Sequence, residues 1–164
     1  MTYSIWLEPI KKDTIYLKNI INYLAKKYDS PIFDPHVTID SEIKELPTNE
    51  KMIKTFQQIL KVDIFSHNLQ FSDYIWKTLF IQLKKNLRLE QIRKMFKDEF
   101  NYNSSYNFEP HISLVYKKLN NNIKKQIIQN IKIKSKFTFD KISIIYSTKE
   151  VKEWKKILTI NLKN

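Results

Sequence analysis

Two short segments of the chain repeat one pattern around a histidine. The segment FDPHVTI occupies residues 33–39 and the segment FEPHISL occupies residues 108–114, so phenylalanine, proline and histidine recur at matching places. The chain has three histidines, and two of them, His36 and His111, lie in this repeat. Each copy also stands between two stretches with helical spacing of apolar residues. A duplicated half-domain explains both the shared pattern and the shared order of elements.

Each copy supplies a hydroxyl group two residues after its histidine. Side chains two apart on a strand point to the same side, so His36 pairs with Thr38, and His111 pairs with Ser113. The proline before each histidine cannot donate to a sheet ladder, which predicts that both segments begin at a strand start or edge. We therefore expect both imidazoles to lie near solvent and a substrate.

Two histidines with pKa values near the working pH can act as general base and general acid without a metal ion. When a cyclic phosphate is hydrolysed, one takes a proton from water and the other gives a proton to the departing ribose oxygen. The hydroxyls of Thr38 and Ser113 can donate hydrogen bonds to the non-bridging phosphate oxygens. The residues alone leave open which histidine is the base and which is the acid.

A lone histidine of this kind is more often a buried group that satisfies backbone atoms, but its repetition in the same septet favours catalysis. A metal site is disfavoured, because two histidines provide two ligands and no cysteine or further histidine stands at ligand spacing. We therefore expect neither a metal nor a cofactor. The third histidine, His67, is interpreted as a surface or turn residue.

Composition excludes several kinds of site. Without cysteine there is no thiolate nucleophile or disulfide, and without glycine there is no glycine-rich phosphate loop, so side chains must hold any phosphate. The balance of 29 Lys and Arg against 17 Asp and Glu gives a net charge of +12, which attracts anionic substrates. A compositional bias toward lysine, isoleucine and asparagine explains this charge equally well.

No segment resembles a signal peptide or a membrane span. The opening MTYSIWLEPIKKD becomes polar and charged within a few residues, and no later apolar run approaches the length of a membrane helix. We expect a soluble, cytoplasmic protein with no membrane partner.

Hydrophobic spacing predicts an α+β fold with mainly antiparallel pairing in a single domain, residues 1–164. Asp13 is a plausible N-cap of the first helix, Ser72 and Asp73 mark a tight reversal, and residues 101–107 have the composition of a mobile loop. Strands are expected at residues 3–8, 35–39, 62–71, 75–83, 111–116, 136–146 and 154–162, and helices at residues 14–28, 52–60, 87–100 and 119–131.

At the repeated segments the chain resembles the two-histidine (2H) phosphoesterase superfamily. The signature of that superfamily is two distant copies of histidine, any residue, and threonine or serine. The opening strand SIWLEP and the second segment PHISLVY are most similar to the cyclic nucleotide phosphodiesterase group of plants and yeasts. Trp6 and Tyr116 carry this finer similarity.

The resemblance implies a bilobal 2H phosphoesterase fold with two pseudo-symmetric antiparallel sheets, outer helices and a central cleft that holds both histidine motifs. It also implies a small cyclic-phosphate substrate. Members open 2',3'-cyclic nucleotides to 2'-phosphates, and those of the most similar group also open ADP-ribose 1'',2''-cyclic phosphate to ADP-ribose 1''-phosphate. Such activity belongs to the clearing of tRNA-splicing by-products or related RNA metabolism. Because this chain lacks glycine, its loops cannot copy those of glycine-rich relatives.

Trp6 and Tyr116 are the remaining candidate substrate-binding residues. Tyr116 stands five residues after His111, so strict strand alternation would place it on the face opposite that histidine. It reaches the phosphate only if the strand ends or bulges after Leu114, and otherwise it packs on the far face of the sheet. Trp6 stacks on a base, closes the cleft wall or belongs to the core.

Two other functions remain open. A 2H enzyme acting on RNA ends, of the 2'-5' RNA ligase-like or oligonucleotide-trimming kind, would use the same motifs and a basic groove. A non-catalytic RNA-binding module would use the lysine-rich helix at residues 119–131, with Tyr102 and Tyr106 stacking on bases, but it leaves the repeated septets unexplained. A cleft within one chain needs no partner subunit, so we expect a monomer.

Overall fold

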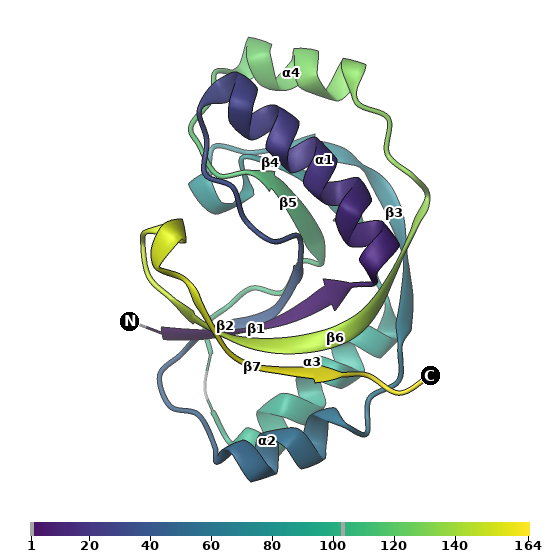
Figure 1. The fold of residues 1–164 in the computed structure, drawn as a ribbon, viewed down its shortest axis with the longest axis vertical. Helices are drawn as coiled ribbons and strands as arrows, with labels where there is room; N and C mark the ends of the chain where they lie inside the picture. Colours follow the sequence, from purple (N-terminus) through teal and green to yellow (C-terminus); the bar gives the residue numbers. More distant parts are fainter. Residues whose placement is uncertain (1, 103) are drawn as a thin grey trace.

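The computed structural model describes residues 2–102 and 104–164 and has the α+β architecture that the sequence predicts (Figure 1). All pairings between its named strands are antiparallel. In chain order the elements are β1 (Thr2–Pro9), α1 (Lys11–Tyr28), β2 (Val37–Ile43), α2 (Asn49–Phe56), β3 (Val62–Phe71), the 3-10 turn η1 (Ile75–Lys77), β4 (Leu79–Leu83), α3 (Leu87–Phe100), β5 (His111–Val115), α4 (Asn121–Asn130), β6 (Lys136–Ser147), the 3-10 turn η2 (Val151–Glu153) and β7 (Lys155–Asn161).

The order of the strands divides the sheet into two equivalent halves. Its strands follow one another as β2-β1-β6-β3-β4-β5, and β7 pairs with β6. The two antiparallel sheets that we expected share β3, whose residues 62–65 pair with β6 and whose residues 66–71 pair with β4. They therefore form one continuous sheet of seven strands. The unit β1-α1-β2 in one half corresponds to β4-α3-β5 in the other.

The strand registers confirm this correspondence at the level of residues. Trp6 on β1 stands opposite Thr38 on β2, and Phe80 on β4 stands opposite Ser113 on β5. Each hydroxyl residue of the septets thus has an aromatic residue as its cross-strand neighbour. The pseudo-symmetry of the fold therefore extends to the candidate site.

The helices lie at the two ends of the molecule, with β1 and β6 between them (Figure 1). The helix α1 leaves β1 and packs against β5 of the other half, while α3 leaves β4 and packs against β2. Each helix therefore covers the strand that carries the opposite septet. Along β1, Ile5 and Leu7 are buried in the core, whereas Ser4 and Trp6 line a cleft. The alternation of strand side chains separates core from cleft.

The prediction that Asp13 caps the first helix is wrong. The helix α1 begins earlier, at Lys11, and Asp13 is a buried residue of its first turn. Its carboxylate accepts a hydrogen bond from the backbone N–H of Thr138 (2.8 Å) and forms an ion pair with Lys134. The polar first turn carries no apolar spacing, so the sequence did not reveal it, and the carboxylate ties α1 to β6 instead.

Several other boundaries differ from the predictions, among them the end of one helix and the start of one strand. The helix α2 ends at Phe56 and not at residue 60. The strand β4 begins at Leu79 and not at residue 75, because Ile75–Lys77 form the turn η1. Ser72 stabilises this turn by donating its hydroxyl to the carbonyl of Lys77 (2.7 Å). The reversal after β3 is therefore longer than the two-residue turn that we expected, and it brings η1 to the rim of the cleft.

Candidate functional site

The two septets meet at one large cleft. Its volume is about 1390 Å³, and its lining includes residues from both halves of the sheet. Five of the six candidate residues line it: His36, Thr38, His111, Tyr116 and Trp6. Within the described ranges, Ser113 is not among the lining residues. The structure thus brings together the two histidines, which lie 75 positions apart in the chain (111 − 36).

His36 lies directly before β2 and is held by a backbone carbonyl and by an aromatic ring. Its Nδ1 lies 2.7 Å from the carbonyl oxygen of Asp34, and its ring stacks on Trp6 with a centroid distance of 3.5 Å and an interplanar angle of 2°. The side chain is only 5% exposed. Burial lowers the pKa of His36 to about 3, against the hydrogen bond to Asp34, which raises it. The free protein therefore holds this imidazole in the neutral form.

His111 begins β5 in an equivalent setting. Its Nδ1 lies 2.6 Å from the carbonyl oxygen of Glu109, and its ring makes an edge contact with Phe80 at a centroid distance of 5.4 Å. Burial lowers the pKa of His111, the Glu109 carbonyl raises it, and the nearby ammonium of Lys77 lowers it further. Both histidines are therefore biased toward neutrality.

The two backbone contacts fix the same tautomer on both rings. A carbonyl oxygen can only accept a hydrogen bond, so the Nδ1 of each imidazole carries the proton. The other ring nitrogen, Nε2, is left with a lone pair that can accept a proton. The acceptor carbonyl belongs in each case to the acidic residue two positions before the histidine. The acidic and proline positions of the septet thus orient the histidine through the backbone.

The two hydroxyl residues differ in their availability. Thr38 lines the cleft, and its side chain makes no hydrogen bond within residues 2–102 and 104–164. Ser113 is buried, and its Oγ donates to the carbonyl oxygen of Trp76 (3.0 Å). The sequence predicted equal roles for the pair. Of these two hydroxyls, that of Thr38 is the one available at the cleft.

Aromatic residues form one wall of the cleft. Tyr116 follows the last residue of β5 and lines the cleft, because the strand ends before strict alternation would turn it away. Its ring stacks on Phe33 at 3.9 Å and meets Trp76 and Trp154 at 5.4 and 5.8 Å. Trp154 also contacts Trp6. Trp76 and Trp154 were not among the predicted site residues, although all three tryptophans of the chain line this cleft.

A second wall of the cleft contains Tyr102 and Tyr106, which lie between α3 and β5. It is held by Asp40, a residue of β2 that is 0% exposed. The Asp40 carboxylate accepts hydrogen bonds from Arg93 Nε (3.1 Å), Tyr102 Oη (3.2 Å) and Ser104 Oγ (2.5 Å). Arg93 also donates to the backbone carbonyl of Tyr106 (2.6 Å). These contacts tie the wall to the strand that carries Thr38.

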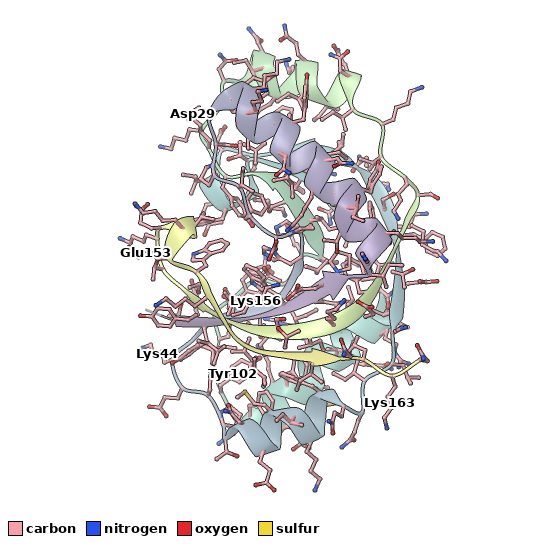
Figure 2. All side chains as sticks on the ribbon, viewed as in Figure 1. Asp29, Lys44, Tyr102, Glu153, Lys156 and Lys163 are labelled. Atoms are coloured by element: carbon pink, nitrogen blue, oxygen red, sulfur yellow. The ribbon has the colours of Figure 1, made fainter. Side chains whose placement is uncertain are left out.

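Charged side chains at the rim give the cleft a cationic character. Lys44, Lys77, Lys97 and Lys149 line it together with Glu42 and Glu109. In Figure 2, Lys44 and Tyr102 lie toward α2 and α3, whereas Glu153 lies on the turn η2, away from both. His67, by contrast, is an exposed residue of β3 outside the lining set, so the prediction of a surface residue is confirmed.

Residues 2–102 and 104–164 contain neither a preformed metal cluster nor a membrane helix. No group of three or more His, Cys, Asp or Glu side chains there is arranged to hold a metal ion. No helix in the same ranges is long and apolar enough to cross a membrane.

Comparison with known proteins identifies the family. Residues 1–162 match the family described as cyclic phosphodiesterase-like protein. The cyclic phosphodiesterase of Arabidopsis thaliana is 24% identical over 125 residues, which cover 75% of this chain and 69% of that protein. The protein TT0787 of Thermus thermophilus shares the fold with a TM-score of 0.63 at 10% identity, covering 99% of this chain and 98% of that chain.

The apo structure of E. coli LigT gives a TM-score of 0.61 at 10% identity, with coverage of 99% and 98%. LigT has also been crystallised with 3'-AMP, NADP+ and ATP. The family match spans nearly the whole sequence. The chain therefore belongs to the cyclic phosphodiesterase-like family.

Proposed function

We propose that this protein hydrolyses cyclic phosphodiesters without a metal, with His36 and His111 as general acid and base. The proposed reactions open 2',3'-cyclic nucleotides to 2'-phosphates and ADP-ribose 1'',2''-cyclic phosphate to ADP-ribose 1''-phosphate. The observation that carries the proposal is that two histidines with matching backbone-fixed tautomers line one cleft. Such reactions would serve the clearing of tRNA-splicing by-products.

The reaction needs one proton acceptor and one proton donor. For a 2',3'-cyclic nucleotide, one imidazole takes a proton through Nε2 from the attacking water as the new P–O bond forms. The P–O3' bond breaks, and the second imidazole, in its protonated form, gives a proton to O3'. Burial disfavours that protonated form in the free protein, but an anionic phosphate beside the ring raises its pKa again. Substrate binding thus helps to charge the acid.

Hydroxyl groups can stabilise the charge on the non-bridging oxygens. Thr38 is placed to donate such a hydrogen bond directly, since its side chain is free at the cleft. Ser113 can do so only after its hydroxyl leaves the Trp76 carbonyl, which a rotation about one bond allows. We infer that Thr38 makes the larger contribution.

The aromatic wall supplies a surface for a nucleobase. Trp6 already uses one ring face for His36, so its main role is to orient that imidazole. Trp76 and Trp154 remain as stacking partners, whereas the buried ring of Tyr116 already stacks on Phe33 and supports them. Stacking of a base on an aromatic ring contributes about 1–3 kcal/mol. The nucleotides bound to LigT support a nucleotide ligand for this fold. The cleft is complete within one chain, so a monomer suffices.

The test is a substrate assay in EDTA. The protein should convert 2',3'-cyclic AMP to 2'-AMP, and ADP-ribose 1'',2''-cyclic phosphate to the 1''-phosphate, at rates that chelation leaves unchanged. Chromatography identifies the products. Activity that is lost in EDTA and restored by a divalent cation would contradict metal independence, and 3'-AMP as the product would contradict the proposed bond cleavage.

A second candidate is action on RNA ends, which the size and charge of the cleft favour. Its volume of about 1390 Å³ exceeds the roughly 300–1,000 Å³ of sites for single small ligands. Lys44 and Lys149 line it and have no ion pair within the described part of the chain. An RNA strand crossing several lysines binds more weakly as salt rises. A KM that rises steeply with salt for an oligonucleotide 2',3'-cyclic phosphate, but little for 2',3'-cyclic AMP, would favour RNA.

A further inference from the structure

Lys77 stands beside His111 at the rim of the cleft. It is the last residue of η1, its side chain is 17% exposed, and it lines the cleft together with His111. Its Nζ lies 2.5 Å from Glu109 Oε2 and 4.5 Å from the centroid of the Phe80 ring. Phe80 in turn contacts the imidazole of His111. The cation and a candidate catalytic group thus contact the same phenyl ring.

The matching acidic residue of the other half pairs with lysines outside the cleft. Asp34 occupies the septet position of Glu109 and pairs with Lys18 at 2.7 Å and with Lys156 at 3.2 Å, and Lys156 also contacts a second carboxylate at 2.7 Å. Within residues 2–102 and 104–164, neither of these two lysines lines the cleft. Lys77 has a single carboxylate partner in those ranges, Glu109, whose side chain is 57% exposed. Of these three lysines, Lys77 is therefore the one that lines the cleft beside a candidate catalytic histidine.

The Glu109 carboxylate of this ion pair is exposed to solvent, so the Lys77 ammonium can exchange it for a better partner. Solvent screens the contact of Lys77 with Glu109, so releasing the ammonium costs little free energy. The long lysine side chain can follow a ligand, and its three N–H donors suit phosphate oxygens. A phosphodiester that is being hydrolysed gains negative charge on its non-bridging oxygens, which a nearby cation stabilises. The hydroxyls of Thr38 and Ser113 provide no such positive charge.

We propose that Lys77 is a phosphate-binding residue whose ammonium rests on Glu109 in the free protein and moves to a non-bridging oxygen of the substrate beside His111. The proposal deepens the proposed function, because it concerns the same cleft and substrate. When the substrate binds, its phosphate replaces the Glu109 carboxylate as the partner of the Lys77 ammonium. The ammonium then also compensates the negative charge that develops on the phosphate during hydrolysis.

Binding of inorganic phosphate, measured by calorimetry, tests the proposal apart from turnover. Lys77→Met should weaken phosphate binding and lower kcat/KM for 2',3'-cyclic AMP by about 10- to 100-fold, the equivalent of one charge-assisted hydrogen bond. Lys77→Arg should restore most of both. Lys136→Met is the matched control, because Lys136 is also ion-paired to a carboxylate, Asp63, but lies outside the cleft lining. It removes the same charge and should leave both values near those of the wild type.

Glu109→Gln tests the resting position of the lysine. It should tighten phosphate binding roughly 2- to 5-fold, which corresponds to the free energy of a surface ion pair. This gain should be larger in the protein that retains Lys77 than in the Lys77→Met background. NMR titration should show a higher pKa for His111 in Lys77→Met, because the ammonium lowers that pKa. Equal phosphate affinity in Lys77→Met and Lys136→Met, or an equal gain from Glu109→Gln in both backgrounds, would overturn the proposal. A wild type that binds phosphate but hydrolyses no cyclic phosphate would instead overturn the proposed function.

Discussion

Burial of His36 should make the protein sensitive to mild acid. Its pKa falls from 6.5 to about 3 on folding, so below about pH 6.5 the unfolded chain binds a proton that the native protein does not. Stability is therefore lost as the pH falls from about 6.5 toward 3. The loss is about 1.4 kcal/mol for each pH unit in this window, or about 2 kcal/mol at pH 5.

The perturbation that isolates this effect is His36→Asn, whose amide can still donate to the Asp34 carbonyl but does not titrate. Urea unfolding at about pH 7.5 and pH 5 measures the free energy of unfolding of both proteins. The carboxylates titrate equally in both, so the wild type should lose about 2 kcal/mol more than His36→Asn over this interval. His67→Asn, at an exposed position, serves as the control and should behave as the wild type. Parallel pH dependences for the wild type and His36→Asn would refute the argument.

Three further predictions concern the walls and hydroxyls of the cleft. Asp40→Asn should lower the free energy of unfolding by about 3 kcal/mol, because Arg93 loses its buried carboxylate, and should raise KM more than it lowers kcat. Asp13→Asn changes a buried acid outside the cleft and should lower the free energy of unfolding without changing KM. If it raised KM as much as Asp40→Asn does, the role of Asp40 in holding the wall of the cleft would be contradicted. Thr38→Val should lower kcat/KM by about 10- to 100-fold and Ser113→Ala by less, whereas equal losses would show that Ser113 turns to the phosphate. Trp154→Ala should raise KM for 2',3'-cyclic AMP by about 10-fold and leave the affinity for inorganic phosphate unchanged, and a parallel loss of both would argue against base stacking.

The septets made the main features of the site predictable from sequence. Strand alternation placed Thr38 on the side of His36, and the proline before each histidine correctly indicated a strand start at Val37 and His111. Whether Tyr116 would face the cleft depended on where β5 ends, and no residue in the sequence marks that point. The fold was predictable to the level of element order, because hydrophobic spacing reports burial along each segment.

Contacts between distant segments were not predictable. The carboxylate of Asp13 accepts a hydrogen bond from β6 and does not cap its own helix. The hydroxyl of Ser113 donates to the carbonyl of Trp76, which lies in a turn where the sequence spacing predicted a strand. The pairing of Lys77 with Glu109 likewise depends on the geometry of η1, which places residues 32 positions apart at one rim. Such contacts need the folded backbone, since one lysine among many carries no mark in the sequence. The presence of three tryptophans in the chain was the available signal for the aromatic wall.

The central claim is that His36 and His111 both perform proton transfer in one cleft. It is tested most directly by kcat/KM for 2',3'-cyclic AMP in EDTA, measured for His36→Ala, His111→Ala and the double variant, each shown to be folded by circular dichroism. We predict that each single change lowers kcat/KM by roughly 10²- to 10⁴-fold. We also predict that the double change costs far less than the product of the two, because the groups act in one step. Near-full activity in either single variant would contradict the two-histidine mechanism.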